Sequence, residues 1–323
     1  MRTRITEMFG IKYPIVCGGM LWLCTPDICA AISEAGGLGN ITAANYSGGE
    51  ELRAAINKVR SLTDKPFGVT ITVLPAVRVT EKMIEEYFQV CCEEKVTVIE
   101  VSGQFATKYL PMVKNAGVKI MHKVGAVRHA KKVEQLGYDA VIAAGVEEGG
   151  HPLNDDVSTM VLTPRIVESV KIPVITTGGI ADGRGLAAAI MLGAEGVLMA
   201  SRFIATYECP VHPNIRQELI DRQENDTILM GKSTGIQGRA LKNKVVNKIL
   251  EIEARAGGIE ELFPLLSGQR AKEAWEVGDI ENAVFYVGQT IGLINDVKTC
   301  EELLSGMVKE TEALLNFNLQ RFN

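Results

Sequence analysis

The chain has 323 residues, and its 34 lysines and arginines against 39 aspartates and glutamates give a formal net charge of −5. A hydrophobic content of 46% with 23% charged residues is typical of a globular protein and excludes a disordered one. The mild acidity argues against a nucleic-acid partner, and no apolar run is long enough to span a bilayer, so a membrane partner is not expected either.

The seven cysteines are an odd number and follow no C-x-x-C spacing. Scattered cysteines of this kind, together with an N-terminus that lacks the apolar core of a signal peptide, predict reduced thiols and a cytoplasmic protein. No group of His, Cys, Asp and Glu has the spacing of metal ligands, so no metal site is expected.

Short apolar runs alternate with amphipathic segments over the first two thirds of the chain. The apolar runs predict strands at Pro14–Cys17, Leu38–Thr42, Phe67–Val73, Val96–Val101, Val118–Lys123, Ala140–Ala144, Val174–Thr177 and Gly196–Met199. The amphipathic segments predict helices at Thr25–Ala35, Gly49–Leu62, Lys108–Ala116, Ala126–Leu136, Thr163–Val170 and Gly183–Leu192. Because strands that alternate with helices pair in parallel, the α/β pattern predicts a (β/α)₈ TIM barrel, with an open doubly wound sheet as the alternative.

The pattern changes after Phe203. Residues 208–285 are rich in helix formers and show no convincing strand series, so we expect a smaller, mostly helical domain that covers the C-terminal face of the barrel. The barrel itself would comprise residues 1–207 and 286–323, with Glu301–Leu319 as a closing helix. The basic stretch Arg239–Lys248 is interpreted as a solvent-exposed helix face.

Reactive groups of a parallel barrel lie on the loops that follow its strands. Paired glycines in Gly18-Gly19-Met20, after the first strand, would let a flat ligand lie against the backbone. Thr177-Gly178-Gly179-Ile180 and Met199-Ala200-Ser201 follow the seventh and eighth strands, whose loops often form a phosphate site in this fold. A sharp strand-to-helix turn is the alternative interpretation of these glycines.

Polar side chains near the ends of other strands are candidates for chemistry. His151 follows Gly149-Gly150 after the sixth strand, where an imidazole could transfer a proton or donate a hydrogen bond. Lys123 ends the fifth strand and would direct its ammonium to the mouth of the barrel, where it could stabilise negative charge; a solvent-facing lysine is the alternative. Thr70 and Thr72, near the end of the third strand, could supply hydroxyls or could be ordinary β-branched strand residues.

Taken together, these motifs resemble those of the nitronate monooxygenase (2-nitropropane dioxygenase) family. The resemblance rests on Pro14–Met20, Ala35–Gly39, Lys65–Val69, Gly149–Pro152, Gly178–Gly185 and Arg202-Phe203, and it continues through Ser267–Arg270 and Gly288–Ile294. That family consists of FMN-dependent barrels and also contains NAD(P)H:quinone reductases and FabK-type enoyl-ACP reductases.

The resemblance implies an FMN site and a role for each motif. Gly18, Gly19 and Met20 would lie beside the flavin ring, Thr72 and Lys123 at its polar edge, and His151 over its reactive face. Gly178 and Gly179, with Ala200 and Ser201, would hold the phosphate, and Gly149, Gly150, Thr177, Ile180 and Met199 would complete the cofactor site. Thr70 stands where the family commonly has Asn, and Met199-Ala200-Ser201 replaces the usual Met-Gly-Thr.

For the reaction, the resemblance favours an NAD(P)H:quinone reductase, in which NADH or NADPH would reduce FMN and FMN would then reduce a small-molecule acceptor. The segment after His151, Pro-Leu-Asn-Asp-Asp, is similar to the quinone reductase branch. Oxidation of nitronates with O₂, FabK-like enoyl reduction and flavin binding without turnover are the alternatives. A homo-oligomer is compatible with the sequence.

Overall fold

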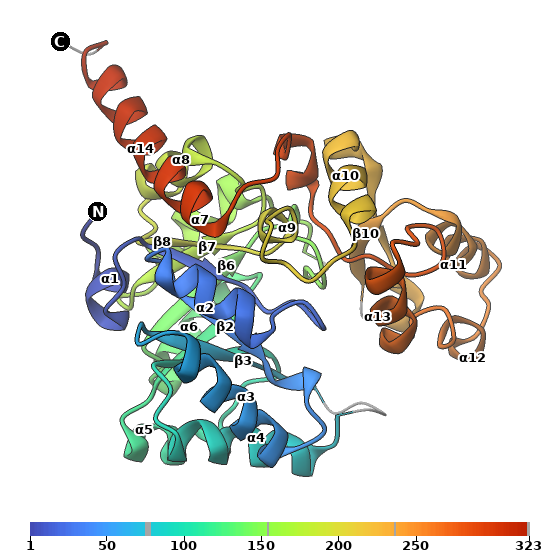
Figure 1. Ribbon diagram of the computed structural model, residues 1–323, viewed down its shortest axis with the longest axis horizontal. Coiled ribbons are helices and arrows are strands. Elements are labelled where there is room, and N and C mark those ends of the chain that lie inside the picture. Colours follow the sequence, from blue (N-terminus) through green and yellow to red (C-terminus); the bar gives the residue numbers. More distant parts are fainter. Residues whose placement is uncertain (75–78, 154, 236, 322–323) are drawn as a thin grey trace.

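Eight parallel strands form a barrel in the computed structural model, which describes residues 1–74, 79–153, 155–235 and 237–321 (Figure 1). The strands are β1 (Ile15–Cys17), β2 (Gly39–Thr42), β3 (Phe67–Val73), β4 (Val98–Gly103), β5 (Lys119–Val124), β6 (Ala140–Ala144), β7 (Val174–Thr177) and β8 (Gly196–Met199). They pair in the order β1-β8-β7-β6-β5-β4-β3-β2. Leu38 closes the ring, because its N–H donates to Ile15 O and its carbonyl accepts from Cys17 N–H, both at 2.9 Å. The predicted TIM barrel is confirmed.

Helices follow the strands and cover the outside of the barrel. They are α2 (Pro26–Glu34), α3 (Gly49–Leu62), α4 (Glu81–Glu93), α5 (Leu110–Ala116), α6 (Val127–Leu136), α7 (Thr159–Val167) and α8 (Gly183–Met191). Helix α4 was not among the predicted helices, although Thr80 caps it by accepting from Met83 N–H. Helix α7 begins at Thr159, four residues before the predicted start, because the Glu147 carboxylate accepts the Thr159 N–H at 3.0 and 3.1 Å.

The inward-facing side chains change from apolar at the N-terminal end of the barrel to polar at the C-terminal end. Ile5 and Phe9 of α1 (Arg4–Phe9) close the N-terminal end and pack on an apolar layer formed by six of the strands and by Leu38, just before β2. Above that layer lie buried polar side chains, among them Asn40, Thr70 and Glu100. Such a gradient places charge and hydrogen-bonding capacity at the end where this fold carries its chemistry.

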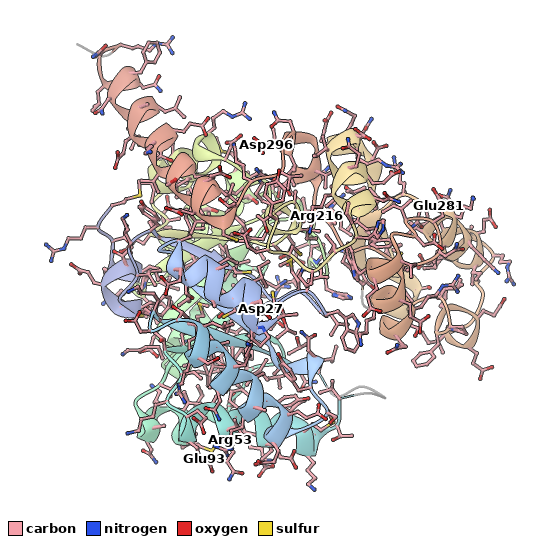
Figure 2. All side chains as sticks on the ribbon, viewed as in Figure 1. Asp27, Arg53, Glu93, Arg216, Glu281 and Asp296 are labelled. Atoms are coloured by element: carbon pink, nitrogen blue, oxygen red, sulfur yellow. The ribbon has the colours of Figure 1, made fainter. Side chains whose placement is uncertain are left out.

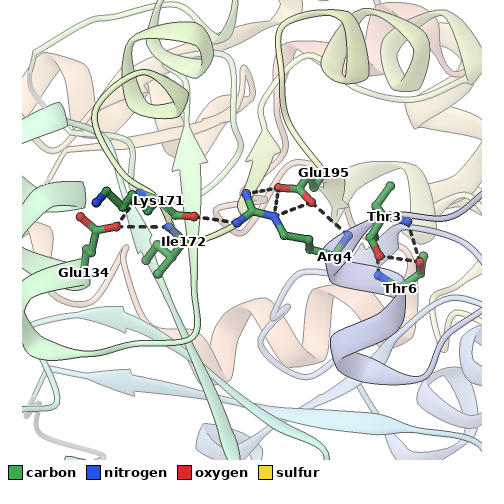
Figure 3. A network of polar contacts seen from close by, with 7 residues as sticks. All are labelled: Thr3, Arg4, Thr6, Glu134, Lys171, Ile172 and Glu195. Carbon is green, nitrogen blue, oxygen red and sulfur yellow. Dashed lines mark hydrogen bonds and ion pairs between the residues drawn. The ribbon is translucent and has the colours of Figure 1, made fainter.

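Polar contacts fasten α1 to the loops before β7 and β8 (Figure 3). The Arg4 guanidinium binds the Glu195 carboxylate and donates to Lys171 O at 2.6 Å. Glu134 of α6 in turn accepts the Lys171 and Ile172 N–H groups. Elsewhere on the helical layer, Arg53 of α3 pairs with Glu93 of α4 (Figure 2).

The appendage lies to one side of the barrel (Figure 1). Its elements are α10 (Pro213–Asp221), β9 (Thr227–Met230), β10 (Gly238–Leu241), α11 (Lys244–Ala254), α12 (Ile259–Leu262) and α13 (Gly268–Val277). The expectation of no strands here is wrong, since β9 and β10 form an antiparallel pair. The exposed-face interpretation of the basic stretch is also wrong at its start, because Arg239 lies in β10 and is buried. The division of the chain at residues 208 and 285 stays a prediction.

The remaining elements return the chain to the barrel. They are α9 (Ser201–Ile204), the closing helix α14 (Cys300–Leu319) and the short 3₁₀ segments Ala43–Asn45, Glu224–Asp226, Lys232–Thr234 and Gln289–Leu293. All seven cysteines are buried free thiols, as expected. Within the described ranges, no helix has the length and apolarity needed to cross a bilayer.

Candidate active site

All residues predicted for the site lie around one end of the barrel, where the strands end. Gly18, Gly19 and Met20 follow β1, Thr72 is near the end of β3, Lys123 lies in β5, Gly149, Gly150 and His151 follow β6, Thr177 ends β7 and precedes Gly178, Gly179 and Ile180, and Met199 ends β8 and precedes Ala200 and Ser201. The side chains of Met20, Ile180 and Met199, however, pack in the apolar cluster between the sheet and the helices. These three residues could therefore contact a ligand at the mouth mainly through their backbone atoms.

The loop after β1 lies directly on the barrel interior. Gly18 N–H donates to Met199 O at 2.8 Å and so joins this loop to the end of β8. A Cβ atom at Gly18 would lie 2.5 Å from Leu198 Cδ2, and one at Gly19 would lie 2.4 Å from Thr70 Cγ2. The absence of a side chain at both positions therefore allows the backbone of this loop to lie close to the barrel interior.

A buried carboxylate that the sequence analysis did not single out lies beneath this loop. Glu100 of β4 accepts from Thr70 Oγ1 at 2.8 Å and from Asn40 Nδ2 at 3.2 Å. Burial raises its pKa to about 7, although the Thr70 hydroxyl, Lys123 and the Gly19 N–H act in the opposite direction. A charged residue inside the apolar run of a strand was the signal in the sequence that could have identified it.

Lys123 forms the second charged feature of the mouth. Its Nζ lies 3.1 and 3.0 Å from the two carboxylate oxygens of Glu148, on the loop after β6. Glu148 is buried, and burial raises the pKa of its carboxyl despite the neighbouring ammonium. The ion pair holds Lys123 in place, and its ammonium provides positive charge at the end of β5.

His151 lies on the same loop and is exposed to solvent at the mouth. Its ring lies against that of Tyr286, with 4.9 Å between the centroids. The surrounding protein and the Lys123 ammonium lower the pKa of His151 below its usual value. The imidazole is therefore neutral at pH 7, where it can donate one hydrogen bond and accept another.

The loops after β7 and β8 carry the backbone N–H groups that are candidates for an anion site. Gly178 and Gly179 have left-handed φ angles of +100° and +78°, and Ala200 keeps a negative φ of −130°. Among the described residues, no acceptor bonds the N–H groups of Gly179, Ala200 and Ser201. The Ser201 hydroxyl accepts from Gly288 N–H at 3.0 Å and still has its own proton to donate. This donor set suits an anion, and α9 is too short for a substantial helix dipole to add to it.

The appendage holds the loop that carries His151. Gly150 and Arg239 of β10 exchange two backbone hydrogen bonds of 3.2 and 2.7 Å. The Arg239 side chain donates to Val146 O at 2.9 Å and to Thr227 Oγ1 at 3.2 Å. These hydrogen bonds could not be predicted from the sequence, because they join segments about ninety residues apart.

Two clefts lie beside the mouth rather than in it. One, of about 290 Å³, lies behind the β7 and β8 loops between Arg202, Asp296 and Glu310. The other, of about 280 Å³, lies between Arg128, Asp155 and Arg165. In the described ranges, no three His, Cys, Asp or Glu side chains gather in a way that could hold a metal ion.

Comparison with known proteins shows the family to which this chain belongs. Residues 2–310 match the profile of the family described as nitronate monooxygenase. The chain belongs to the nitronate monooxygenase family. The resemblance of its loop motifs is thereby confirmed, and the members of this family in the comparisons support an oxidoreductase.

Named relatives and a solved structure match along nearly the whole chain. A Rhodococcus jostii protein named (3aS,4S,5R,7aS)-5-hydroxy-7a-methyl-1-oxo-octahydro-1H-indene-4-carboxyl-CoA dehydrogenase is 33% identical over 96% of each chain. A probable nitronate monooxygenase of Staphylococcus aureus is 29% identical over 98% of this chain and 99% of its own. The structure of FabK from Thermotoga maritima is 39% identical over 100% of both chains, with a TM-score of 0.92.

Proposed function

We propose that the protein is an FMN-dependent oxidoreductase that takes electrons from NADH or NADPH and reduces the conjugated double bond of an enoyl thioester. The observation that carries this proposal is the match to FabK over the full length of both chains at 39% identity. The Rhodococcus relative adds support, because its name also describes a thioester substrate, a carboxyl-CoA. The protein would act in the cytoplasm on small-molecule or carrier-bound acyl groups.

Two features of the mouth fit FMN. The Gly18-Gly19 backbone would lie against the ring, and a Cβ at either position would shift this loop because it would meet Leu198 or Thr70. The free N–H groups of Gly179, Ala200 and Ser201 form a donor set for the phosphate, on the two loops that hold phosphate in many TIM barrels. When bound, FMN would supply a centre that accepts a hydride from a nicotinamide and passes it to a second substrate.

The chain's own residues would bind and orient the reactants. Lys123, held by Glu148, would stabilise negative charge at the polar edge of the ring, with the Thr72 hydroxyl nearby. Neutral His151 would donate a hydrogen bond to the thioester carbonyl, which withdraws electron density from the double bond. Overall, the nicotinamide supplies the hydride and water supplies the proton, so one C=C bond becomes a CH–CH bond.

A quinone is the second candidate acceptor. The segment Pro-Leu-Asn-Asp-Asp after His151 is similar to the quinone reductase branch. The backbone carbonyls of Pro152 and Leu153 accept from Gln237 Nε2 at 3.3 and 2.9 Å. Asn154, the next residue in the sequence, lies outside the described residues. Quinones and enoyl thioesters are both conjugated carbonyl compounds, so the same hydrogen-bond donor could serve either.

Steady-state assays distinguish the acceptors. We expect purified protein to be yellow and to oxidise NADH or NADPH faster with crotonyl-CoA or crotonyl-carrier protein than with menadione. Faster turnover with menadione would instead support the quinone reductase. A colourless protein that binds no added FMN would contradict the whole proposal.

A further inference from the structure

The loop that would carry the flavin ring is supported from below by one buried carboxylate. Glu100 is 2% exposed and pairs in the sheet register with Thr70 of β3, whose hydroxyl donates to it at 2.8 Å. The Gly19 N–H is directed at the same carboxylate. Glu100 therefore joins the centre of the barrel to the middle of the Gly18-Gly19-Met20 loop.

Asn40 extends this support to the start of the loop. Its Nδ2 donates to Cys17 O at 2.6 Å and to Glu100 Oε2 at 3.2 Å, so one amide group joins the end of β1 to the carboxylate. The same carboxylate oxygen, Oε2, accepts from both Thr70 and Asn40. A carboxylate can accept several hydrogen bonds at once, whereas an amide or a protonated carboxyl in its place must accommodate donors as well.

We propose that Glu100 is a positioning residue, whose ionised carboxylate fixes the Gly18-Gly19-Met20 loop in the form that binds the flavin ring. The inference rests on the proposed FMN site. It assigns a function to a buried charge that neither the fold nor the predicted chemistry otherwise uses. Thr70 contributes to this positioning, because its hydroxyl donates its hydrogen bond to Glu100 and not to a ligand.

The charges that face Glu100 come from three other elements. Lys123 of β5 favours the ionised form of Glu100, and Glu148 on the loop after β6 disfavours it. The third group is the Cys17 thiol of β1, whose pKa is raised further by the Glu100 carboxylate. Burial outweighs the favourable contacts and brings the pKa of Glu100 to about 7. The carboxyl is thus mostly protonated in mildly acidic solution and mostly ionised in mildly alkaline solution.

The test is the affinity of flavin-free protein for FMN, measured by fluorescence quenching for the wild type and for Glu100→Gln. The isosteric amide keeps the volume but loses the charge. We expect the Kd of Glu100→Gln to be about ten times that of the wild type at about pH 8 and nearly equal to it at about pH 5.5. Titration of the FMN phosphate, His151 and Glu148 occurs in both proteins and largely cancels in the ratio.

Matched variants separate positioning from general damage. Thr70→Val removes one donor to the carboxylate and should weaken FMN binding in the same direction, whereas Glu168→Gln, an exposed carboxylate of the helical layer, should leave the Kd unchanged. A Kd ratio for Glu100→Gln that is near one at both pH values, or equally large at both, would overturn the proposal.

Hydrogen exchange keeps this inference distinct from the proposed function. In flavin-free protein, amides of the loop between Cys17 and Cys24 should exchange several-fold faster in Glu100→Gln than in the wild type and in Glu168→Gln. If the wild type binds no FMN, the proposed function fails while this comparison still decides the role of Glu100. Equal exchange in all three proteins would refute that role.

Discussion

Two kinds of residue at the mouth have different proposed roles. Polar side chains would take part in the reaction, and glycines would bind the cofactor. His151 belongs to the first kind, because it is exposed there and neutral at pH 7. We expect His151→Ala to lower kcat with an enoyl thioester by about 100-fold and to leave the flavin content unchanged. Absorbance of the bound flavin and steady-state rates measure both effects.

The pH dependence of that reaction follows from the direction of the His151 pKa shift. Because the folded protein lowers this pKa, the imidazole stays neutral from alkaline solution down to well below pH 6.5. The part of kcat that is lost in His151→Ala should therefore be constant between about pH 6 and about pH 8. If the kcat of the wild type fell as the pH was lowered through that interval, and the kcat of His151→Ala did not, the result would contradict this expectation. It would show that the imidazole becomes cationic near neutrality and is inactive in that form. His129→Ala, on α6, is the matched control and should retain the wild-type rate.

Gly179 belongs to the second kind. Its φ of +78° strains any other residue, but a Cβ there would meet no atom closer than 3.9 Å. Gly179→Ala should therefore cost about 1 kcal/mol of folding free energy and weaken FMN binding more than tenfold, because the methyl group would occupy the expected place of the phosphate.

Gly117 is the matched control for this substitution. It has a similar φ of +72° at the C-cap of α5, and a Cβ there would meet nothing within 4 Å. Gly117→Ala should lower the Tm by a similar amount and leave the Kd for FMN unchanged. Equal Kd values for the two variants would contradict the phosphate assignment.

At the scale of elements, the contact of β10 with the loop after β6 should determine how well His151 is placed. Arg239→Met keeps most of the side-chain volume but leaves the half-buried Val146 carbonyl without its donor. We expect faster hydrogen exchange over residues 147–153 and a several-fold higher KM for the acceptor, with unchanged flavin content. Arg255→Met removes an exposed arginine that pairs with Glu261, and it should change neither quantity.

The strands were predicted well because each buried strand is a short run of apolar residues that can be recognised in the local sequence. Four of them, including Phe67–Val73 and Ala140–Ala144, match their expected bounds at both ends. The β9–β10 pair was missed because its strands are four residues each and no tight-turn signal joins them. Glycines and His151 could be assigned to the mouth from their position after strands. The contacts of Glu100, Glu148 and Arg239 could not, since tertiary neighbours decide whether a buried charge is satisfied.

At the scale of the whole molecule, the two ends of the barrel should be separable by mutation. Arg4 fastens α1 to Glu195 and Lys171, on the end opposite the mouth. Arg4→Ala should lower the free energy of unfolding by about 0.5 to 1 kcal/mol, the usual value of a partly exposed ion pair. Chemical denaturation measures this loss, and FMN affinity and turnover should equal those of the wild type. A loss of flavin in this variant would show that the two ends are coupled.

The most direct test of the proposed reaction is anaerobic. Flavin-loaded protein is mixed separately with NADH, with NADPH and with a small alkyl nitronate, and the visible flavin band is followed; crotonyl thioester is then added to whichever sample has bleached. We predict rapid bleaching by a nicotinamide, none by the nitronate, and recovery of the band when the thioester is added. Bleaching by the nitronate alone would contradict the account and show that the protein oxidises nitronates.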